Sequence, residues 1–376
     1  MTFLLLFLLI YGLANLYIGW RNLLWLQSFF PVSPFLYWTV LAAVASSPIA
    51  ARVMARSGYV DTGYWTAVGD WWLAVTYWSV LIWLLTDLLR FVSRYVTAQA
   101  SHAISGTIQG ITVNLLIFVL LLYGSWNALQ PVVVRHEITV QKQIGGLGPI
   151  KAVMVSDIHI GRVVDSGRVQ LLADMLIKLN PDIVFYVGDI IDDDAGYAAD
   201  RNLIAPLATV KPRLGSYAVL GNHEYIGGQP DECADLMVKA GITVLRDRVT
   251  LVQDLFYVAG REELSASRYG GKDRKSLAEL LTGLDPSRPL ILLDHHPLLK
   301  GDPVPPSADL QLSGHSHRGQ FFPNNLITSY LYETDWGLYK KEAFHLIVSS
   351  GYGTWGPPVR IGTRAEIVEI MIHYHK

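Results

Sequence analysis

The first 130 residues are dominated by long runs of apolar side chains. A helix that crosses a lipid bilayer needs about 20 residues, and four runs approach or reach this length: Phe3–Trp20, Phe35–Ala51, Trp71–Val92 and Ile111–Leu129. Trp and Tyr side chains stand near the ends of these runs, where amphipathic rings favour the headgroup region of a bilayer. The pattern therefore predicts a transmembrane anchor of about four helices over residues 1–130.

The opening segment, MTFLLLF, could be mistaken for a secretory signal peptide. It carries no positively charged side chain, and no clear cleavage site of small residues follows it. We therefore expect this segment to be retained as an anchor. The arginines that flank the four runs divide three against three between the two sides of the membrane. The positive-inside rule therefore leaves the orientation undetermined.

Asp87 is the one acid within the predicted spans. An intramembrane carboxylate can mark an ion path. Asp87, however, lies near the end of its run, and Arg90 follows one helical turn later. We expect an ion pair between these two side chains at the membrane interface rather than a transport site.

Beyond Val132 the pattern changes to short apolar runs that alternate with segments of helical periodicity. Strands are predicted at IKAVMVSD, IVFYVGD, GSYAVLG, PLILLD, DLQLSG and FHLIV, and a first strand at VVVRHEITV. Helical spacing is found over residues 165–182, 200–211, 231–241 and 274–285, and residues 243–262 are predicted to form a pair of strands. This alternation is typical of an α/β domain, here over residues 131–376, whose sheet is covered on both faces.

Composition separates the same two parts. The chain has 376 residues and a net charge of −2, but residues 1–150 hold only seven of its 30 Lys and Arg residues and four of its 32 acids. A charge-poor first part and a charge-rich second part fit a membrane region followed by a soluble region. The slight acidity and the absence of a basic run argue against nucleic acid as a partner. The single cysteine, Cys233, excludes an internal disulfide and is expected to pack in a helix.

Polar side chains follow five of the predicted strands at the point where each strand ends. In chain order they are Asp157 and His159, then Asp189, then Asn222 and His223, then His295 and His296, and finally His315 and His317. In open α/β sheets, ligands collect just beyond the carboxyl ends of the strands. Five separate loops would therefore bring these side chains into one crevice.

A cluster of carboxylates and imidazoles without a cation would be repulsive or unsatisfied. Asp, Asn and His ligands without a thiolate suit divalent Mn, Fe or Zn. Two such ions would share one carboxylate, and we expect Asp189, which opens the Gly-Asp turn, to be that bridge. A pair of ions holds a hydroxide that is nucleophilic near neutral pH. The expected reaction is therefore hydrolysis of a phosphate ester or anhydride by a hydroxide that bridges the two metals.

Five motifs occur in order along the second part of the chain: D-x-H, G-D-x-x-D, G-N-H-E, a histidine before x-P, and G-H-x-H. Together they resemble the calcineurin-like metallophosphoesterase superfamily, and the similarity covers roughly residues 132–372, including GYGTWGPPVRIG. Within it, the chain looks closest to a membrane-attached bacterial subgroup of the YkuE and YaeI type. The resemblance implies a two-sheet α/β phosphoesterase domain after the transmembrane helices.

The resemblance also implies a role for each motif residue. One metal would be held by Asp157, His159, Asp189 and His317, and the other by Asp189, Asn222, His295 and His315. His223 would bind no metal but would stabilise charge on the phosphate or protonate the leaving oxygen. Asp157 or Asp192 could orient a neighbouring imidazole.

Several residues near the motifs have more than one interpretation. His295 is favoured over His296 as the ligand, because the family pattern places the ligand two residues before the proline. Glu224 could cap a helix or accept a bond from a ligand histidine. Arginines 162, 318 and 360 could grip a second phosphate, but surface salt bridges are the simpler expectation. Four aromatic residues, Phe321, Phe322, Trp336 and Trp355, could line a lipid entrance, although core packing is more common for such side chains.

Taken together, the sequence predicts an integral, multi-pass protein of the bacterial plasma membrane that carries a two-metal phosphohydrolase at the bilayer surface. The expected partners are the lipid bilayer and a phosphorylated, lipid-linked substrate. One alternative is a pyrophosphatase that acts on a nucleotide-linked glycolipid. Another, of a different class, is a non-catalytic membrane scaffold or sensor on the same fold. The complete set of motif residues argues against the scaffold.

Overall fold

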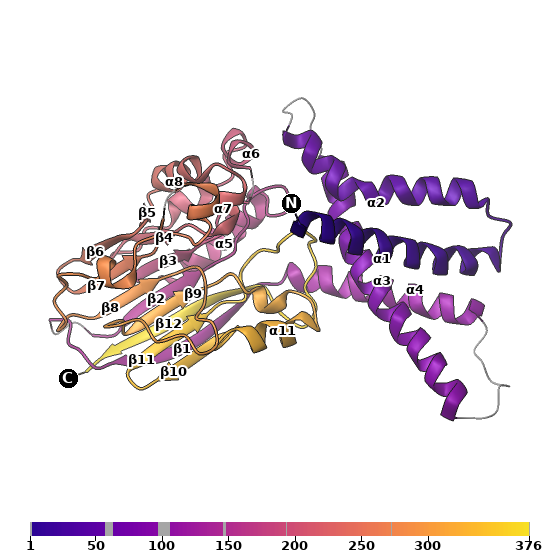
Figure 1. Ribbon diagram of the computed structural model, residues 1–376. Coiled ribbons are helices and arrows are strands. Elements are labelled where there is room, and N and C mark those ends of the chain that lie inside the picture. Colours follow the sequence, from indigo (N-terminus) through magenta and orange to yellow (C-terminus); the bar gives the residue numbers. More distant parts are fainter. Residues whose placement is uncertain are drawn as a thin grey trace. The chain divides into compact units, whose positions relative to one another are not determined.

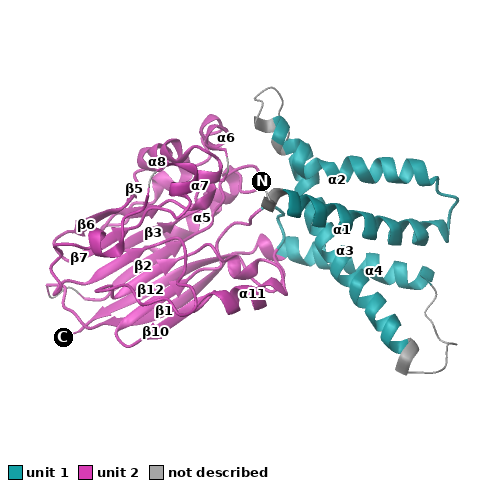
Figure 2. Cartoon of the chain, viewed as in Figure 1, with its two compact units in different colours: residues 1–126, 356–359 teal, residues 127–355, 360–376 magenta. Residues whose placement is uncertain are grey.

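The computed structural model describes residues 2–56, 63–96, 106–145, 148–192, 194–271 and 273–375. The chain forms two compact units (Figure 2). Unit 1 comprises residues 1–126 with 356–359, and unit 2 comprises residues 127–355 with 360–376.

Unit 1 consists of long apolar helices (Figure 1). They are α1 (Thr2–Gln27), α2 (Pro34–Arg56), α3 (Gly63–Val96) and α4 (Gly106–Ala128). Within the described residues, three segments have the length and composition to cross a membrane: Pro34–Ala51, Gly63–Ser93 and Gly106–Ala128. The predicted run Phe3–Trp20 is helical within α1, and its role as a further span stays a prediction.

The partner expected for Asp87 was wrong. Its Oδ1 atom accepts a hydrogen bond of 2.7 Å from Arg21 on α1, and its Oδ2 atom accepts one of 2.7 Å from Tyr17. Arg21 is 66 positions away in the sequence, so this ion pair depends on helix packing rather than on local spacing. The predicted span also began too late, because α3 starts at Gly63 and includes a second, buried acid, Asp70.

Unit 2 is built on two six-stranded sheets. The first has the strand order β1-β12-β2-β3-β4-β5, and the second has the order β10-β11-β9-β8-β7-β6. In the first sheet the strands are β1 (Val132–Val140), β2 (Ile150–Val155), β3 (Ile183–Val187), β4 (Ser216–Val219), β5 (Thr243–Val244) and β12 (Glu366–Tyr374). In the second they are β6 (Arg248–Val252), β7 (Phe256–Gly260), β8 (Leu290–Leu293), β9 (Leu310–Ser313), β10 (Gly337–Lys341) and β11 (Phe344–Val348). The two-sheet architecture that the resemblance implied is confirmed.

The strands that carry the motifs run parallel within each sheet. The strands β2, β3 and β4 pair in parallel, and so do β8 and β9. Alternate side chains of a strand point to opposite faces. Met154 and Phe185 of the first sheet therefore face Leu293 and Leu312 of the second sheet. The four side chains belong to one core between the sheets. The intervening residues of β2 and β3 face helices on the outside of the first sheet.

The outer face of the first sheet is covered mainly by α5 (Ser166–Leu179) and α8 (Pro230–Lys239). Asp165 caps the start of α5, and Asn180 ends it in a left-handed conformation with φ 47°. Cys233 on α8 is a free, buried thiol, so the expectation that it packs in a helix is confirmed. The remaining short helices of unit 2 are α6 (Ala195–Asp200), α7 (Asn222–Ile226), α9 (Ala266–Tyr269), α10 (Leu277–Leu280) and α11 (Asn324–Leu331).

Two local predictions were wrong. The helix expected over residues 200–211 is replaced by the end of α6 and a 3-10 turn, Ala205–Thr209, because Pro206 cannot continue an α-helix. The segment 243–262 forms three strands rather than two, since β5 pairs with β4 in the first sheet before β6 and β7 join the second.

Candidate metal centre

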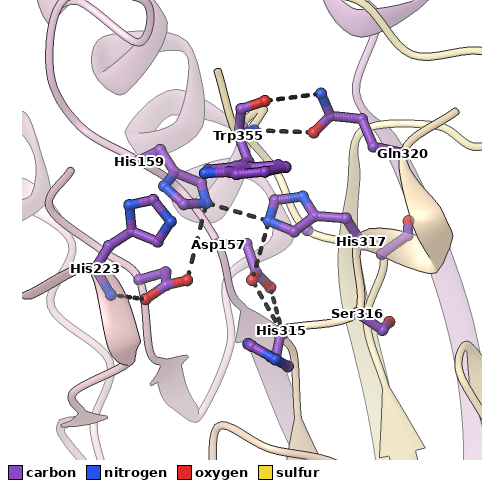
Figure 3. Close-up of polar contacts among 12 residues, drawn as sticks. Asp157, His159, His223, His315, Ser316, His317, Gln320 and Trp355 are labelled. Atoms are coloured by element: carbon purple, nitrogen blue, oxygen red, sulfur yellow. Dashed lines mark hydrogen bonds and ion pairs between the residues drawn. The ribbon is translucent and has the colours of Figure 1, made fainter. Parts of the chain in front are cut away.

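All the side chains predicted for the site lie beyond the carboxyl ends of parallel strands. Asp157 and His159 follow β2, Asp189 follows β3, Asn222 and His223 open α7 after β4, His295 follows β8, and His315 and His317 follow β9. Figure 3 shows the rings of His159 and His317 pointing toward one another beside Asp157. The crevice that the sequence predicted is therefore formed by loops from both sheets.

One group of possible metal ligands consists of Asp157, His159 and His317, whose ligand atoms all lie within 4.8 Å of one another. The Nε2 atoms of the two histidines are 3.1 Å apart, and His317 Nε2 lies 3.3 Å from Asp157 Oδ1. All three side chains are buried. Nitrogens and oxygens that converge in this way, away from solvent, are suited to a shared cation.

A second group consists of Asp189, His295 and His315, again with ligand atoms within 4.8 Å. Asp189 Oδ2 is 3.2 Å from His295 Nε2 and 4.0 Å from His159 Nε2, which belongs to the first group. Asp189 therefore lies between the two groups. Asn222 is next to the second group, because its Oδ1 atom is 2.8 Å from His315 Nδ1.

The backbone at these positions is strained. Five of the predicted ligands have left-handed conformations: φ is 50° at Asp157, 53° at His159, 49° at Asp189, 66° at His315 and 45° at His317. A non-glycine residue in this region costs roughly 1–3 kcal/mol, and such residues cluster at functional sites. The strain is held by the neighbouring strands, since Asp157 N donates to Gly188 O and His159 N donates to Asp189 O, each at 3.0 Å.

Two glycines allow the loops to approach this closely. A Cβ atom at Gly188, where φ is +77°, would lie 2.2 Å from His295 Nδ1. A Cβ atom at Gly221 would lie 2.2 Å from Asp189 Oδ1. The glycines of the G-D and G-N-H-E motifs are therefore needed for close packing around Asp189.

The electrostatics of the site fit a divalent metal. Burial lowers the pKa of His315 and His317 well below the usual value, so both are neutral imidazoles, the form that binds metal. Burial by itself would raise the pKa of Asp189, but His295 and His223 hold it well below its usual range, so this carboxylate is ionised. The buried Nε2 atom of His295 lies 3.2 Å from Asp189 Oδ2 but makes no hydrogen bond of good geometry among the described residues. A buried polar atom without a well-formed hydrogen bond is costly, and a metal ion would satisfy it.

Neighbouring groups contact the Nδ1 atoms of three imidazole rings and so fix the orientation of these rings. His295 Nδ1 is 2.9 Å from the carbonyl oxygen of Val187. Asp192 Oδ1 lies 3.4 Å from His159 Nδ1 and 3.0 Å from His223 Nδ1. Such contacts set the tautomer and the orientation of a ligand histidine. The sequence suggested Asp157 or Asp192 for orienting an imidazole ring, and Asp192 makes the contacts that this role requires.

The structure also shows the contacts of Glu224 and His296, for which the sequence left two interpretations. Glu224 accepts hydrogen bonds from the backbone N–H groups of Gly221, Ile190 and Ile191, which fits the capping interpretation. Burial, together with the nearby charge of Asp189, raises the pKa of Glu224 to about 7. His296 Nε2 lies 2.7 Å from Glu263 Oε1, so His296 pairs with an acid, whereas His295 belongs to the second ligand group.

The expectation of surface salt bridges was wrong for Arg360. Its side chain is completely buried, and the guanidinium donates to the carbonyl oxygens of Ser350, Gly351 and Gly353. Its Nη2 atom also lies 3.3 Å from His317 Nδ1. Arg360 therefore supports a predicted ligand, which the sequence analysis missed. Its place in GYGTWGPPVRIG, the last motif of the resemblance, was the available signal.

The remaining arginines and aromatics behave differently from one another. The guanidinium of Arg162 lies 4.2 Å from the ring centre of Tyr197, and that of Arg318 lies 4.2 Å from that of Trp336. Trp336 is partly buried and donates to Glu366. The core-packing expectation was wrong for Phe322 and Trp355, which are exposed.

Comparisons with known proteins agree with this geometry. The sequence pattern of the family described as "Calcineurin-like phosphoesterase" matches residues 150–319. A Danio rerio protein named "Transmembrane protein with metallophosphoesterase domain" is 31% identical over 91% of this chain and 82% of its own length. An "Uncharacterized metallophosphoesterase" of Aquifex aeolicus is 33% identical over 68% of this chain and 98% of its own. The "Uncharacterized metallophosphoesterase YkuE" of Bacillus subtilis is 27% identical over 65% and 87%.

Proposed function

Because the chain belongs to the calcineurin-like metallophosphoesterase family and is a metal-dependent phosphoesterase with transmembrane helices, we propose that it hydrolyses a phosphate ester or anhydride at a two-metal centre. The observation that carries this proposal is the pair of ligand groups, Asp157–His159–His317 and Asp189–His295–His315, with Asp189 between them.

The residues divide between two ions in this proposal. Asp157, His159, Asp189 and His317 hold the first ion, and Asp189, Asn222, His295 and His315 hold the second. Asp, Asn and His donors without cysteine suit Mn, Fe or Zn. Two such ions supply Lewis-acid activation of water and of the phosphoryl oxygens.

The protein's own contribution to bond cleavage comes from His223. Asp192 is 3.0 Å from its Nδ1 atom, and the backbone N–H of His223 donates to Asp189 Oδ1 at 2.8 Å. The carboxylate of Asp192 stabilises a protonated ring, and its position at Nδ1 directs proton exchange to Nε2. In hydrolysis, the oxygen of water forms the new bond to phosphorus, and the leaving oxygen takes a proton from His223 as general acid.

The membrane anchor favours a substrate that is itself in the membrane. We propose a phosphorylated lipid or lipid-linked anhydride, and a multi-pass topology in the bacterial plasma membrane. A chain in lipid nanodiscs can be offered both a soluble phosphodiester and phosphorylated lipids. Activity on the soluble ester together with none on any lipid phosphate contradicts the lipid assignment but not the phosphoesterase activity. In water labelled with oxygen-18, the label appears in the phosphoryl product and identifies which bond is hydrolysed.

The assignment of Asp189 is tested by Asp189→Asn with Asp235→Asn as the matched control, since Asp235 is exposed on α8. The first change removes the shared carboxylate, and turnover is expected to fall by more than about 10³-fold, equal to about 4 kcal/mol of transition-state stabilisation. Asp235→Asn leaves turnover unchanged. Hydrolysis that survives in Asp189→Asn at the wild-type rate contradicts the assignment of Asp189 as the carboxylate shared by two metals.

A further inference from the structure

The helix α11 carries an unusual concentration of exposed apolar side chains. Phe322, Leu326, Ile327, Tyr330 and Leu331 form what is called here the α11 surface, and none of the residues of α11 is buried. Leu326 and Ile327 are each 60% exposed and Tyr330 is 74% exposed. Single exposed apolar residues are ordinary, but five within ten positions, four of them on α11, are a concentration that favours an interaction site.

The patch is one face of the helix rather than a loose segment. Leu326 and Tyr330 are four residues apart, as are Ile327 and Leu331, so the pairs lie side by side along the helix. Thr328, between them, donates a hydrogen bond of 2.5 Å to Asp335 Oδ2. The polar side of α11 is therefore fixed to unit 2, while the apolar side is directed outward.

The same contacts join α11 to the metal centre. The carbonyl oxygen of Asp335 accepts a hydrogen bond of 2.6 Å from Ser316, which stands between His315 and His317. The chain from His317 reaches Phe322 in five residues, through Gln320. Gln320 bonds in both directions with the backbone of Trp355, whose side chain is 61% exposed (Figure 3). The α11 surface thus lies beside the predicted site.

One loop of unit 2, residues 360–363, indicates what the α11 surface contacts. The side-chain amide of Asn127, in the last turn of α4, donates to Arg360 O at 2.9 Å and to Thr363 O at 2.7 Å. The backbone N–H of Phe322 donates to Ile361 O at 2.7 Å on the same loop. Asn127, which lies at the end of a candidate membrane span in the sequence, and Phe322, at the start of the α11 surface, therefore bond to the same loop of unit 2.

We propose that the α11 surface docks onto the lipid bilayer that the chain's own helices span. Leu, Ile, Phe and Tyr on one face are the side chains by which helices lie in a membrane interface, and Tyr favours the headgroup level. Lys300, whose ammonium group is 5.7 Å from the ring centre of Tyr330, stands where a cation meets the headgroups. The bilayer is favoured over a second copy of the chain because the tether through Asn127 is continuous with the same loop.

Docking is tested by lipid quenching in the full chain. Ile327→Cys and the control Val238→Cys, which is 58% exposed on α8, are each made with the buried Cys233 replaced by Ala. Both are labelled with an environment-sensitive fluorophore in nanodiscs of phosphatidylcholine and phosphatidylglycerol. Lipids with brominated acyl chains are expected to quench the label at 327 strongly and the label at 238 weakly. Equal, weak quenching at both positions overturns the proposal. So does a signal at 327 that depends on protein concentration, which indicates a second copy.

A kinetic experiment separates docking from the proposed lipid substrate. Ile327→Asp is expected to raise the KM for a phosphorylated lipid in the bilayer about tenfold and to leave kcat/KM for a soluble ester unchanged. Val238→Asp changes neither. The quenching result needs no turnover, so it stands if the substrate proves to be soluble. An Ile327→Asp enzyme with an unchanged KM for a lipid that it does hydrolyse contradicts the docking proposal.

Discussion

The two units of the chain compensate carboxylates that are partly or fully buried in different ways. In unit 1, Asp87 has a cation of the protein itself, because Arg21 donates to one oxygen and Tyr17 to the other. In unit 2, Asp157 and Asp189 are paired with imidazoles, including those of His317 and His295. Burial lowers the pKa of His317 well below its usual value, and a neutral imidazole does not offset the charge of a carboxylate.

This difference separates a structural ion pair from a site. A carboxylate that has its own arginine is complete, and the guanidinium of Arg21 lies in addition 4.4 Å from the ring centre of Trp83. Carboxylates that converge with ring nitrogens, in strained backbone conformations, instead form a site suited to an external cation. Removal of metal should therefore affect unit 2 alone, and removal of the charge of Asp87 should affect unit 1 alone.

Removal of metal is expected to have the largest effect. An ion present at 1,000 times its dissociation constant stabilises the folded state by about 4 kcal/mol, so a chelator should destabilise unit 2 strongly. Unit 1, with its internal ion pair, should not respond. Hydrogen–deuterium exchange in nanodiscs measures both units at once. Peptides that contain Asp157 and Asp189 should exchange faster after chelation, whereas peptides of α3 should not.

Two controls accompany the exchange measurement. Addition of Mn, Fe or Zn after chelation should restore the slow exchange around Asp189, and the most effective ion identifies the metal that the site prefers. In Asp189→Asn the chelator should change little, because the shared carboxylate is already lost. Protection around Asp157 that is identical with and without metal contradicts the need for an external cation.

The next largest effect is expected for Asp87→Asn in unit 1. It leaves the guanidinium of Arg21, whose side chain is only 15% exposed, without an ionised partner. Loss of a hydrogen bond to a charged group costs roughly 1.5–3 kcal/mol. Unfolding by SDS in mixed micelles can be followed by tryptophan fluorescence, since nine of the 11 tryptophans are in unit 1. Phosphoesterase activity should be unaffected.

A paired change makes the unit 1 prediction sharper. Arg21→Met together with Asp87→Leu removes both charges, and replacement of a buried ion pair by apolar side chains is often neutral. The double variant should therefore recover most of the stability that Asp87→Asn loses. A double variant less stable than Asp87→Asn means that the pair contributes more than charge compensation.

A smaller effect is expected for Arg360→Lys in unit 2. Burial lowers the pKa of Arg360 to about 10, so the side chain is charged at neutral pH, but its role depends on several donors. They contact His317 and the carbonyl oxygens of Ser350 and Gly353. Lysine keeps the charge but cannot make all these bonds. Loss of a group that supports a metal ligand lowers metal affinity about 10- to 100-fold.

Calorimetric titration of metal into the chelated protein measures the effect of Arg360→Lys without reference to turnover. Arg135→Lys is the matched control, because Arg135 is exposed and pairs with Glu369 on the neighbouring strand. Affinity should be unchanged in the control. Equal affinities in the wild type and in Arg360→Lys indicate that Arg360 stabilises the loop alone and does not position His317.

The comparison also explains what the sequence could predict. Each polar set at the site comes directly after a short buried strand, so local spacing alone indicated that Asp157, Asp189 and His315 lie in one crevice. Local spacing also predicted the long apolar helices of unit 1. Local spacing failed where a contact joins distant segments, as for Arg21 with Asp87, 66 positions apart, and Arg360 with His317, 43 positions apart.

The architecture of unit 2 was predictable from the sequence only in part. Alternating strands and helices gave the α/β class, whereas the division into two sheets came from the resemblance rather than from periodicity. The strand β12 was not assigned, although it pairs with both β1 and β2 and is central to the first sheet. The strands β5, β6 and β7 were merged into one pair, because sheet membership is decided by packing between the sheets and not by local pattern.

The smallest effect is expected for Tyr17→Phe in unit 1, and it tests the central point of the comparison. The change removes the hydroxyl that donates to Asp87 Oδ2 but leaves the bond from Arg21 to Oδ1. Because the carboxylate keeps its cation, the loss should be about 1 kcal/mol, the usual net value of one hydrogen bond. SDS unfolding measures it beside Asp87→Asn. If Tyr17→Phe destabilises unit 1 as much as Asp87→Asn does, the partly buried carboxylate of Asp87 is stabilised by the number of its hydrogen bonds rather than by the presence of a cation. The contrast with the metal centre then fails.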